Sequence, residues 1–199
     1  MKRVLIAAIA MFGAGAWLLP SATLGQQRLV IKPLAEKRVA DLPAGELFWR
    51  IQRFPTLAQA QAAAGPWGLA AESAGTEWLF TLGPAGGSSA GGTVVAEVGP
   101  IHRIAASQYL LRINEASGAP GSITSVHTHP GSEAFYVLSG EQDIRTPQGV
   151  VRIGSGRSQA GSGSDTPMQV SSGGSTELHA LVMFVVDAGK PFSSPAKFP

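Results

Sequence analysis

The sequence contains no cysteine, and only 14% of its 199 residues are charged. Without cysteine the protein can have no disulfide, no lipid-anchored cysteine and no cysteine nucleophile, so its stability has to come from its core alone. The sparse charges form no Lys/Arg cluster of the kind that binds nucleic acid or an anionic membrane surface. A small-molecule ligand or substrate is therefore the expected partner.

The first 25 residues have the pattern of a secretory signal peptide. Lys2 and Arg3 precede an apolar run, residues 4–19, and small residues follow up to Gly25. The run is shorter than the ~20 residues that span a bilayer. Of the 15 basic residues, two lie here and no acidic residue does, so 13 basic and 13 acidic residues remain. We expect a neutral protein, exported to the periplasm or medium, without stable membrane association after cleavage.

The chain is rich in glycine (25) and proline (14), scattered among short Val/Ile/Leu/Phe runs. This composition favours many short strands over a helical bundle. In residues 26–107, an N-terminal extension, we expect a surface arm (26–43), strands at 47–51, 78–82 and 93–98, and one helix near 56–64. The Gly/Ser-rich stretch from Gly83 to Gly92 predicts a flexible hairpin loop. Strands at 109–113 and 133–138 and a final apolar run at 178–186 favour a sandwich or barrel.

Two histidines and one glutamate form the main candidate site. On a strand, His127 and His129 project from the same face, because Thr128 between them turns to the other. The turn Pro130-Gly131-Ser132 then brings Glu133 back beside them. Two imidazoles and one carboxylate, with other positions left open, suit Fe(II), and Mn, Zn, Ni or Co can occupy similar ligands. The pattern predicts one divalent metal ion held by His127, His129 and Glu133.

The spacing around these residues resembles the first motif of the cupin superfamily. Gly121, five residues, His127-Thr128-His129, three residues, Glu133, six residues and Gly140 match that motif. The resemblance covers residues 108–187 and leaves 188–199 as a C-terminal tail. It implies an all-β, cupin-type jelly-roll β-barrel with the metal inside, here with extra N-terminal strands and one short helix. It also implies a homodimer.

The second cupin motif is degenerate in this chain. Between Gly156 and Val170 the outline remains, but Met168 stands where the resemblance places a further histidine ligand. A thioether is a softer and weaker ligand than imidazole, so Met168 is either a packed core side chain, the favoured interpretation, or a fourth ligand. His179 replaces the missing ligand if its face of the last strand points inward.

Several further side chains are candidates for the surroundings of the ion. Arg112, Arg145 and Arg152 could orient an anionic ligand. The apolar pocket is predicted to be lined by Tyr109, Phe135 and Met183, together with Met168 and Phe184.

Three functions fit this pattern. The first is a metal-dependent enzyme, of oxygenase or isomerase type, acting on a small organic molecule. The second is a non-catalytic module that binds metal or a small ligand, and the third is an empty structural cupin. One fold hosts many activities, so the site has to decide between them.

Overall fold

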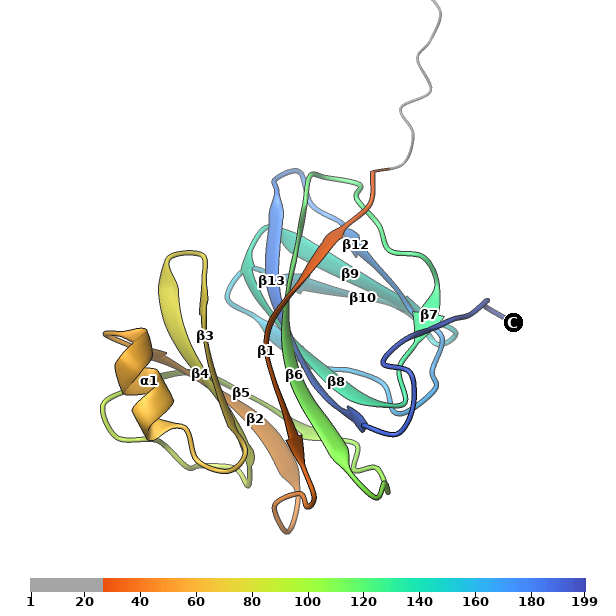
Figure 1. Cartoon of the computed structure of the whole chain (residues 1–199). Helices are drawn as coiled ribbons and strands as arrows, with labels where there is room; N and C mark the ends of the chain where they lie inside the picture. The colour runs from red at the N-terminus through yellow and green to blue at the C-terminus, as the bar shows by residue number, and fades with distance from the viewer. Residues whose placement is uncertain (1–26) are drawn as a thin grey trace, which may run out of the picture.

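The computed structural model describes residues 27–199 (Figure 1). The predicted signal peptide, residues 1–25, lies outside the described residues. In the described part, no helix is long and apolar enough to cross a membrane. The elements are β1 (Val30–Val39), β2 (Leu47–Phe54), α1 (Leu57–Ala63), β3 (Gly68–Ser73), β4 (Thr76–Gly83), β5 (Thr93–Ile101), β6 (Tyr109–Gly118), β7 (His127–Thr128), β8 (Gly131–Ser139), β9 (Glu141–Thr146), β10 (Gly149–Gly154), β11 (Ser158–Ala160), β12 (Gln169–Ser172), β13 (Leu178–Asp187) and β14 (Ser194–Pro195).

The strands form sheets that are stacked against one another. A central five-stranded sheet has the order β1-β6-β13-β8-β11. On one side lies the four-stranded sheet β3-β4-β2-β5, and on the other the three-stranded sheet β10-β9-β12 (Figure 1). The short pair β14-β7 completes the structure. The prediction of an all-β fold with one short helix is confirmed.

Strands β8 and β13 of the five-stranded sheet are buried on both faces. Successive residues of a strand point to opposite faces. On β13, Leu181, Met183 and Val185 therefore pack against the four-stranded sheet. Val182 and Phe184, from the same strand, pack toward the three-stranded sheet. The face that carries Val182 and Phe184 is the one that leads to the candidate site.

Helix α1 forms where its sequence predicts it. The Thr56 hydroxyl caps the first turn by accepting a hydrogen bond from the backbone N–H of Gln59 at 3.2 Å. Ala60 is the buried residue of the helix and packs against Phe54 and Leu79 of the four-stranded sheet. The helix ends just before Gly65-Pro66, as expected.

Two segments of the N-terminal extension differ from expectation. The predicted surface arm contains β1, an edge strand that pairs antiparallel with β6 over nine residue pairs from Val30↔Ser117 to Val39↔Tyr109. Part of the extension thus belongs to the central sheet. Strand β3 is not predicted from its sequence, because Gly68 and three small residues in its run give it little β propensity.

The stretch Gly83–Gly92 is not a hairpin loop. Strands β4 and β5, which it joins, do not pair with each other, because both lie alongside β2. The loop therefore crosses β2. Two polar side chains of β2, Arg50 and Gln52, hold it there, and both are buried.

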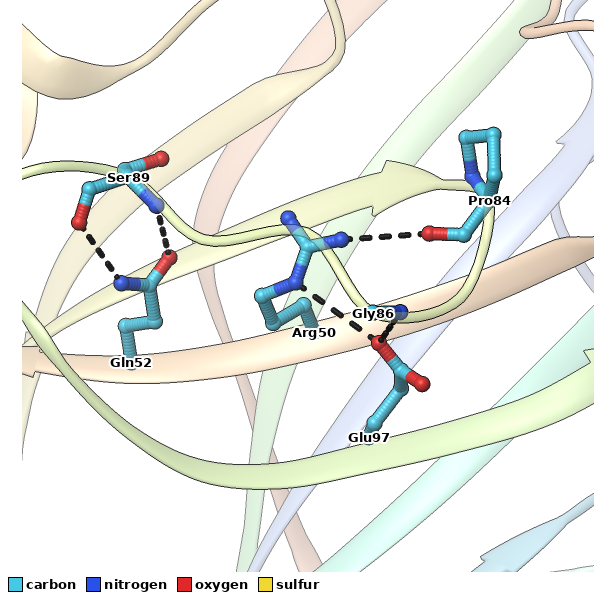
Figure 2. Close-up of polar contacts among 6 residues, drawn as sticks. All are labelled: Arg50, Gln52, Pro84, Gly86, Ser89 and Glu97. Atoms are coloured by element: carbon cyan, nitrogen blue, oxygen red, sulfur yellow. Dashed lines mark hydrogen bonds and ion pairs between the residues drawn. The ribbon is translucent and has the colours of Figure 1, made fainter.

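Figure 2 shows how these two side chains hold the loop. The Gln52 amide exchanges two hydrogen bonds with the backbone of Ser89, both at 3.0 Å. Arg50 donates to the carbonyl of Pro84 at 3.1 Å and lies 3.7 Å from the carboxylate of Glu97, which also accepts from the N–H of Gly86 at 2.9 Å. The loop is therefore fastened by its backbone groups, which explains why a Gly/Ser-rich sequence can occupy this place.

We predict that Gln52→Leu lowers the free energy of unfolding by about 1–3 kcal/mol, because the two backbone groups of Ser89 lose their partner. Urea unfolding measures the effect. Gln61→Leu is the matched control, since Gln61 is an exposed residue of α1. The free energy of unfolding of Gln61→Leu should stay within about 0.5 kcal/mol of that of the parent chain. Equal losses in the two variants would contradict a specific role of the amide.

Candidate metal centre

The rings of His127 and His129 lie close together. The ring centroids are 5.0 Å apart and the rings are nearly perpendicular, at 86°. His127 Nδ1 donates to the carbonyl of Ser125 at 2.8 Å, and His129 Nδ1 donates to the carbonyl of Phe192 at 2.7 Å. A carbonyl can only accept, so each Nδ1 carries a proton, and in the neutral form of the ring Nε2 keeps the lone pair. This is the tautomer that binds a metal through Nε2.

His129 is neutral at physiological pH. Burial, the largest cause, lowers its pKa to about 4, and the charges of His127 and Arg112 act in the same direction. The hydrogen bond to the Phe192 carbonyl opposes the shift. The lone pair of His129 is thus available without the loss of a proton.

Glu133 is a buried carboxyl group on β8. It is 5% exposed, and burial raises its pKa to about 8. Within residues 27–199, no hydrogen bond or opposite charge offsets this loss of hydration. At neutral pH the group is therefore mostly protonated, and a nearby cation would favour its ionised form.

Both histidines and Glu133 line one cavity of about 610 Å³. The predicted turn Pro130-Gly131-Ser132 is not a hairpin turn, because Gly131 and Ser132 belong to β8 and pair with β13, whereas β7 pairs with β14. Glu133 stands opposite Phe184 of β13, and Phe184 opposite Arg112 of β6. These residues share the face that is turned toward the three-stranded sheet. The cavity is lined by Arg28, Leu29, Ile31, Asn114, Ile123, Thr124, Ser125, Val126, His127, His129, Glu133, Phe135, Val170, Val182, Phe184, Phe192, Ser193 and Pro195.

The three residues fit a divalent cation by their chemistry. They offer two nitrogen lone pairs and one carboxyl group that lacks a compensating partner. They do not form a finished ligand set: in the described part of the chain, no three His, Asp or Glu side chains lie close enough together to hold an ion. Closure around an ion would require these side chains to rearrange within the cavity.

Met168 is a core residue. It is 1% exposed and belongs to the apolar cluster between the five-stranded and three-stranded sheets. Its backbone pairs with His127 through two hydrogen bonds, of 2.9 and 2.8 Å, so it supports the histidine from the neighbouring chain segment. Its side chain does not line the cavity. This placement agrees with the packed interpretation rather than with a fourth ligand.

Three predicted site residues point away from the cavity. His179 lies on the other face of β13, 3.9 Å from Glu115 and 3.7 Å from Glu177, so it cannot supply the fourth ligand. Met183 shares that face and packs against the four-stranded sheet. Tyr109 packs against the same cluster from β6. The pocket-lining prediction is thus wrong for Met183 and Tyr109, because alternation along each strand places them on the opposite side.

The arginines differ in their surroundings. Arg112 lies on the cavity side of β6, with its guanidinium 4.3 Å above the ring of Phe192 and its Nε donating to Asn114 Oδ1 at 3.0 Å. Arg145 stacks on Phe198, and Arg152 forms an exposed pair with Asp143. Only Arg112 of the three lies beside the candidate site.

The sequence motif does not predict three residues that belong to the site. Asn114 lines the cavity from β6. Gly161 packs so closely on Glu133 that a Cβ there would lie 2.5 Å from its Cγ. Phe192 comes from the C-terminal tail. Each reaches the site by strand pairing or chain packing, which residue spacing alone does not reveal.

No family model matches this sequence, and no curated protein does. Three similar solved structures are a cupin superfamily protein from Desulfitobacterium hafniense (17% identity, TM-score 0.35), a polyketide cyclase from Streptomyces resistomycificus (19%, 0.37) and a cupin-like protein from Thermotoga maritima (13%, 0.40). The matches cover 39%, 45% and 44% of this chain, and 68%, 62% and 65% of those chains. At this level of likeness, the function of the protein has to be argued from its own site.

We predict that Glu133→Gln flattens the pH dependence of stability of the metal-free protein. Because the folded-state pKa of Glu133, about 8, lies above its ordinary value of 4.5, the folded chain binds more protons in this range and loses stability as pH rises. His129, with its pKa lowered from 6.5 to about 4, acts in the opposite sense, but only below pH 6.5. The Glu133 effect therefore dominates between pH 6.5 and 8.

Urea unfolding at a series of pH values in this window tests the prediction. The parent chain should lose about 1–2 kcal/mol between the lower and upper ends of this window, and Glu133→Gln should lose much less. Glu46→Gln, which changes an exposed carboxyl group, should behave as the parent does. The same slope in all three proteins would show that Glu133 is not the buried acid described above.

Proposed function

We propose that this protein binds one divalent metal ion through His127, His129 and Glu133 and acts as a metal-dependent enzyme on a small organic molecule. The observation that carries this proposal is that two Nε2 lone pairs and one uncompensated buried carboxyl group line a single cavity. With three protein ligands, further positions on the ion stay open for substrate or water. The proposed reaction is of the oxygenase or isomerase type.

The bound ion would supply Lewis-acid chemistry or, if redox-active, reaction with O₂. The residues of the chain have the supporting roles. Glu133 gives up its proton when it becomes a ligand, and the carbonyls of Ser125 and Phe192 hold the two imidazoles. Apolar side chains such as Phe135, Val182 and Phe184 limit the access of water.

Asn114 indicates which substrates the cavity suits. Its Oδ1 accepts from Arg112 Nε, which fixes the amide and leaves the NH₂ group as a hydrogen-bond donor at the cavity. Its neighbours Val182 and Phe135 are apolar. The cavity therefore suits a small molecule with an apolar body and an acceptor oxygen, such as a carbonyl or carboxylate.

The metal ions are proposed to bind with a stoichiometry close to one per chain. Titration calorimetry with Mn²⁺, Co²⁺, Ni²⁺ and Zn²⁺ measures this, and elemental analysis of protein from its own host identifies the native ion. We expect His127→Ala to weaken binding by at least about 100-fold, because it removes a direct ligand, whereas outer partners are worth 10–100-fold. His179→Ala is the control, since His179 faces away from the cavity, and its affinity should be unchanged. Equal affinity in the parent and His127→Ala would contradict the proposed site.

A non-catalytic binding module is the alternative, because Met168 replaces the expected second-motif histidine and packs in the core. The two functions differ in whether the bound ion keeps an open coordination position, which a catalyst needs for its substrate. Azide, a small anionic ligand, should change the visible spectrum of the Co²⁺-loaded protein if such a position exists. A spectrum that does not respond to azide, in protein shown to hold Co²⁺, would favour the non-catalytic module. Export and a homodimer remain predictions from the sequence.

A further inference from the structure

The C-terminal tail runs beside the strand that carries the histidines. Strand β14 pairs antiparallel with β7, with Ser194 opposite Thr128 and Pro195 opposite His127. The N–H of Ala196 donates to the carbonyl of Val126 at 3.0 Å. Figure 1 shows this segment (dark blue) passing next to β7. The tail thus lies against the metal-binding motif, although it is about 60 residues away in the sequence.

Phe192 is the residue of this tail that contacts His129 directly. Its carbonyl accepts the hydrogen bond from His129 Nδ1 at 2.7 Å, and its ring lies 4.7 Å from the imidazole. The ring also packs on Phe184 at 4.9 Å and lies below the guanidinium of Arg112 at 4.3 Å. Phe192 is therefore held from three sides while its carbonyl holds the imidazole.

The tail is also a wall of the cavity. Phe192, Ser193 and Pro195 all line it. Beyond them, the ring of Phe198 stacks under Arg145 at 4.5 Å, which attaches the end of the segment to the three-stranded sheet. The contact of Phe192 with His129 is thus part of an ordered segment, fastened before and after the site.

We propose that Phe192 is a positioning residue for His129. Its ring fastens the tail so that its carbonyl keeps the proton of His129 on Nδ1 and turns the lone pair of Nε2 toward the cavity. A buried imidazole without this acceptor can carry its proton on either nitrogen, and its ring can rotate about the Cβ–Cγ bond. This role in metal binding rests on the proposed function, whereas the hydrogen bond between His129 and the Phe192 carbonyl is present in the metal-free chain.

The test uses the full chain and reads the tautomer of His129 without metal. Long-range ¹H–¹⁵N spectra distinguish a protonated from an unprotonated ring nitrogen. The parent protein should show His129 with Nε2 unprotonated, and Phe192→Ala combined with Ala196→Pro, which removes the ring and the donor to Val126, should show a mixture of tautomers. Phe192→Leu alone keeps most of the volume and serves if the double variant does not fold. It should show a smaller change in the same direction.

Phe198→Ala is the matched control, because it removes another aromatic ring of the same tail without contact to His129. The pairing of β14 with β7 and the contacts of the Phe192 ring remain in this variant and still hold the segment at His129. Phe198→Ala should leave the tautomer unchanged. The second measurement is Co²⁺ affinity, which we expect to fall about 10–100-fold in the double variant, as is typical for loss of an outer partner of a ligand histidine. The single variant Phe192→Tyr, which keeps an aromatic ring, should bind Co²⁺ with the affinity of the parent protein.

The outcomes separate this proposal from the proposed function. An unchanged His129 tautomer in both the double variant and Phe192→Leu overturns the role of Phe192. If the parent protein binds no Co²⁺, the proposed metal site fails, whereas the tautomer spectra still decide whether Phe192 orients His129.

Discussion

The burial of strands β8 and β13 on both faces of the five-stranded sheet is the constraint on which the rest of the structure depends. One face packs against the four-stranded sheet and the other against the three-stranded sheet. Every residue of β8 and β13 is therefore assigned to one side by strand alternation. Glu133 reaches the cavity because it shares a side with Phe135, whereas Ala134 and Tyr136 between and beyond them form the opposite core. A register slip of one residue would bury Glu133 in that apolar core.

The candidate site sits in this sheet at a local cost. Glu133 is buried without a partner, and burying an ionised carboxyl group is unfavourable unless a charge or hydrogen bonds compensate it. The protein avoids much of this cost at neutral pH because the group is protonated. Departures of this kind from the usual rule for buried polar groups are concentrated at functional sites. The neutral imidazole of His129 lies on the same cavity, so this part of the donor set is poor in charge until an ion arrives.

The cavity is bounded by segments from both ends of the described chain. Leu29, just before β1, and Ile31, within β1, line it from the N-terminal side, and Phe192 and Pro195 line it from the tail. Neither segment belongs to the motif that predicts the ligands. The motif supplies the donor atoms, and the flanking segments shape the space around them and hold His129 through a backbone carbonyl.

What the sequence by itself determined is local: the donor atoms of His127, His129 and Glu133, and helix α1 with its Thr56 cap, depend on residues close together in the chain. The predicted turn before Glu133 is wrong, because Gly131 and Ser132 already pair with β13. The side of β13 that reaches the cavity could not be predicted, because both faces are buried and the run from Leu178 to Val186 is apolar almost throughout. Met183 and Phe184 look alike in such a run. Only the tertiary structure decided between them, as it decided the crossing of Gly83–Gly92 over β2 and the contact of Phe192 with His129, because each depends on which distant segments pack together.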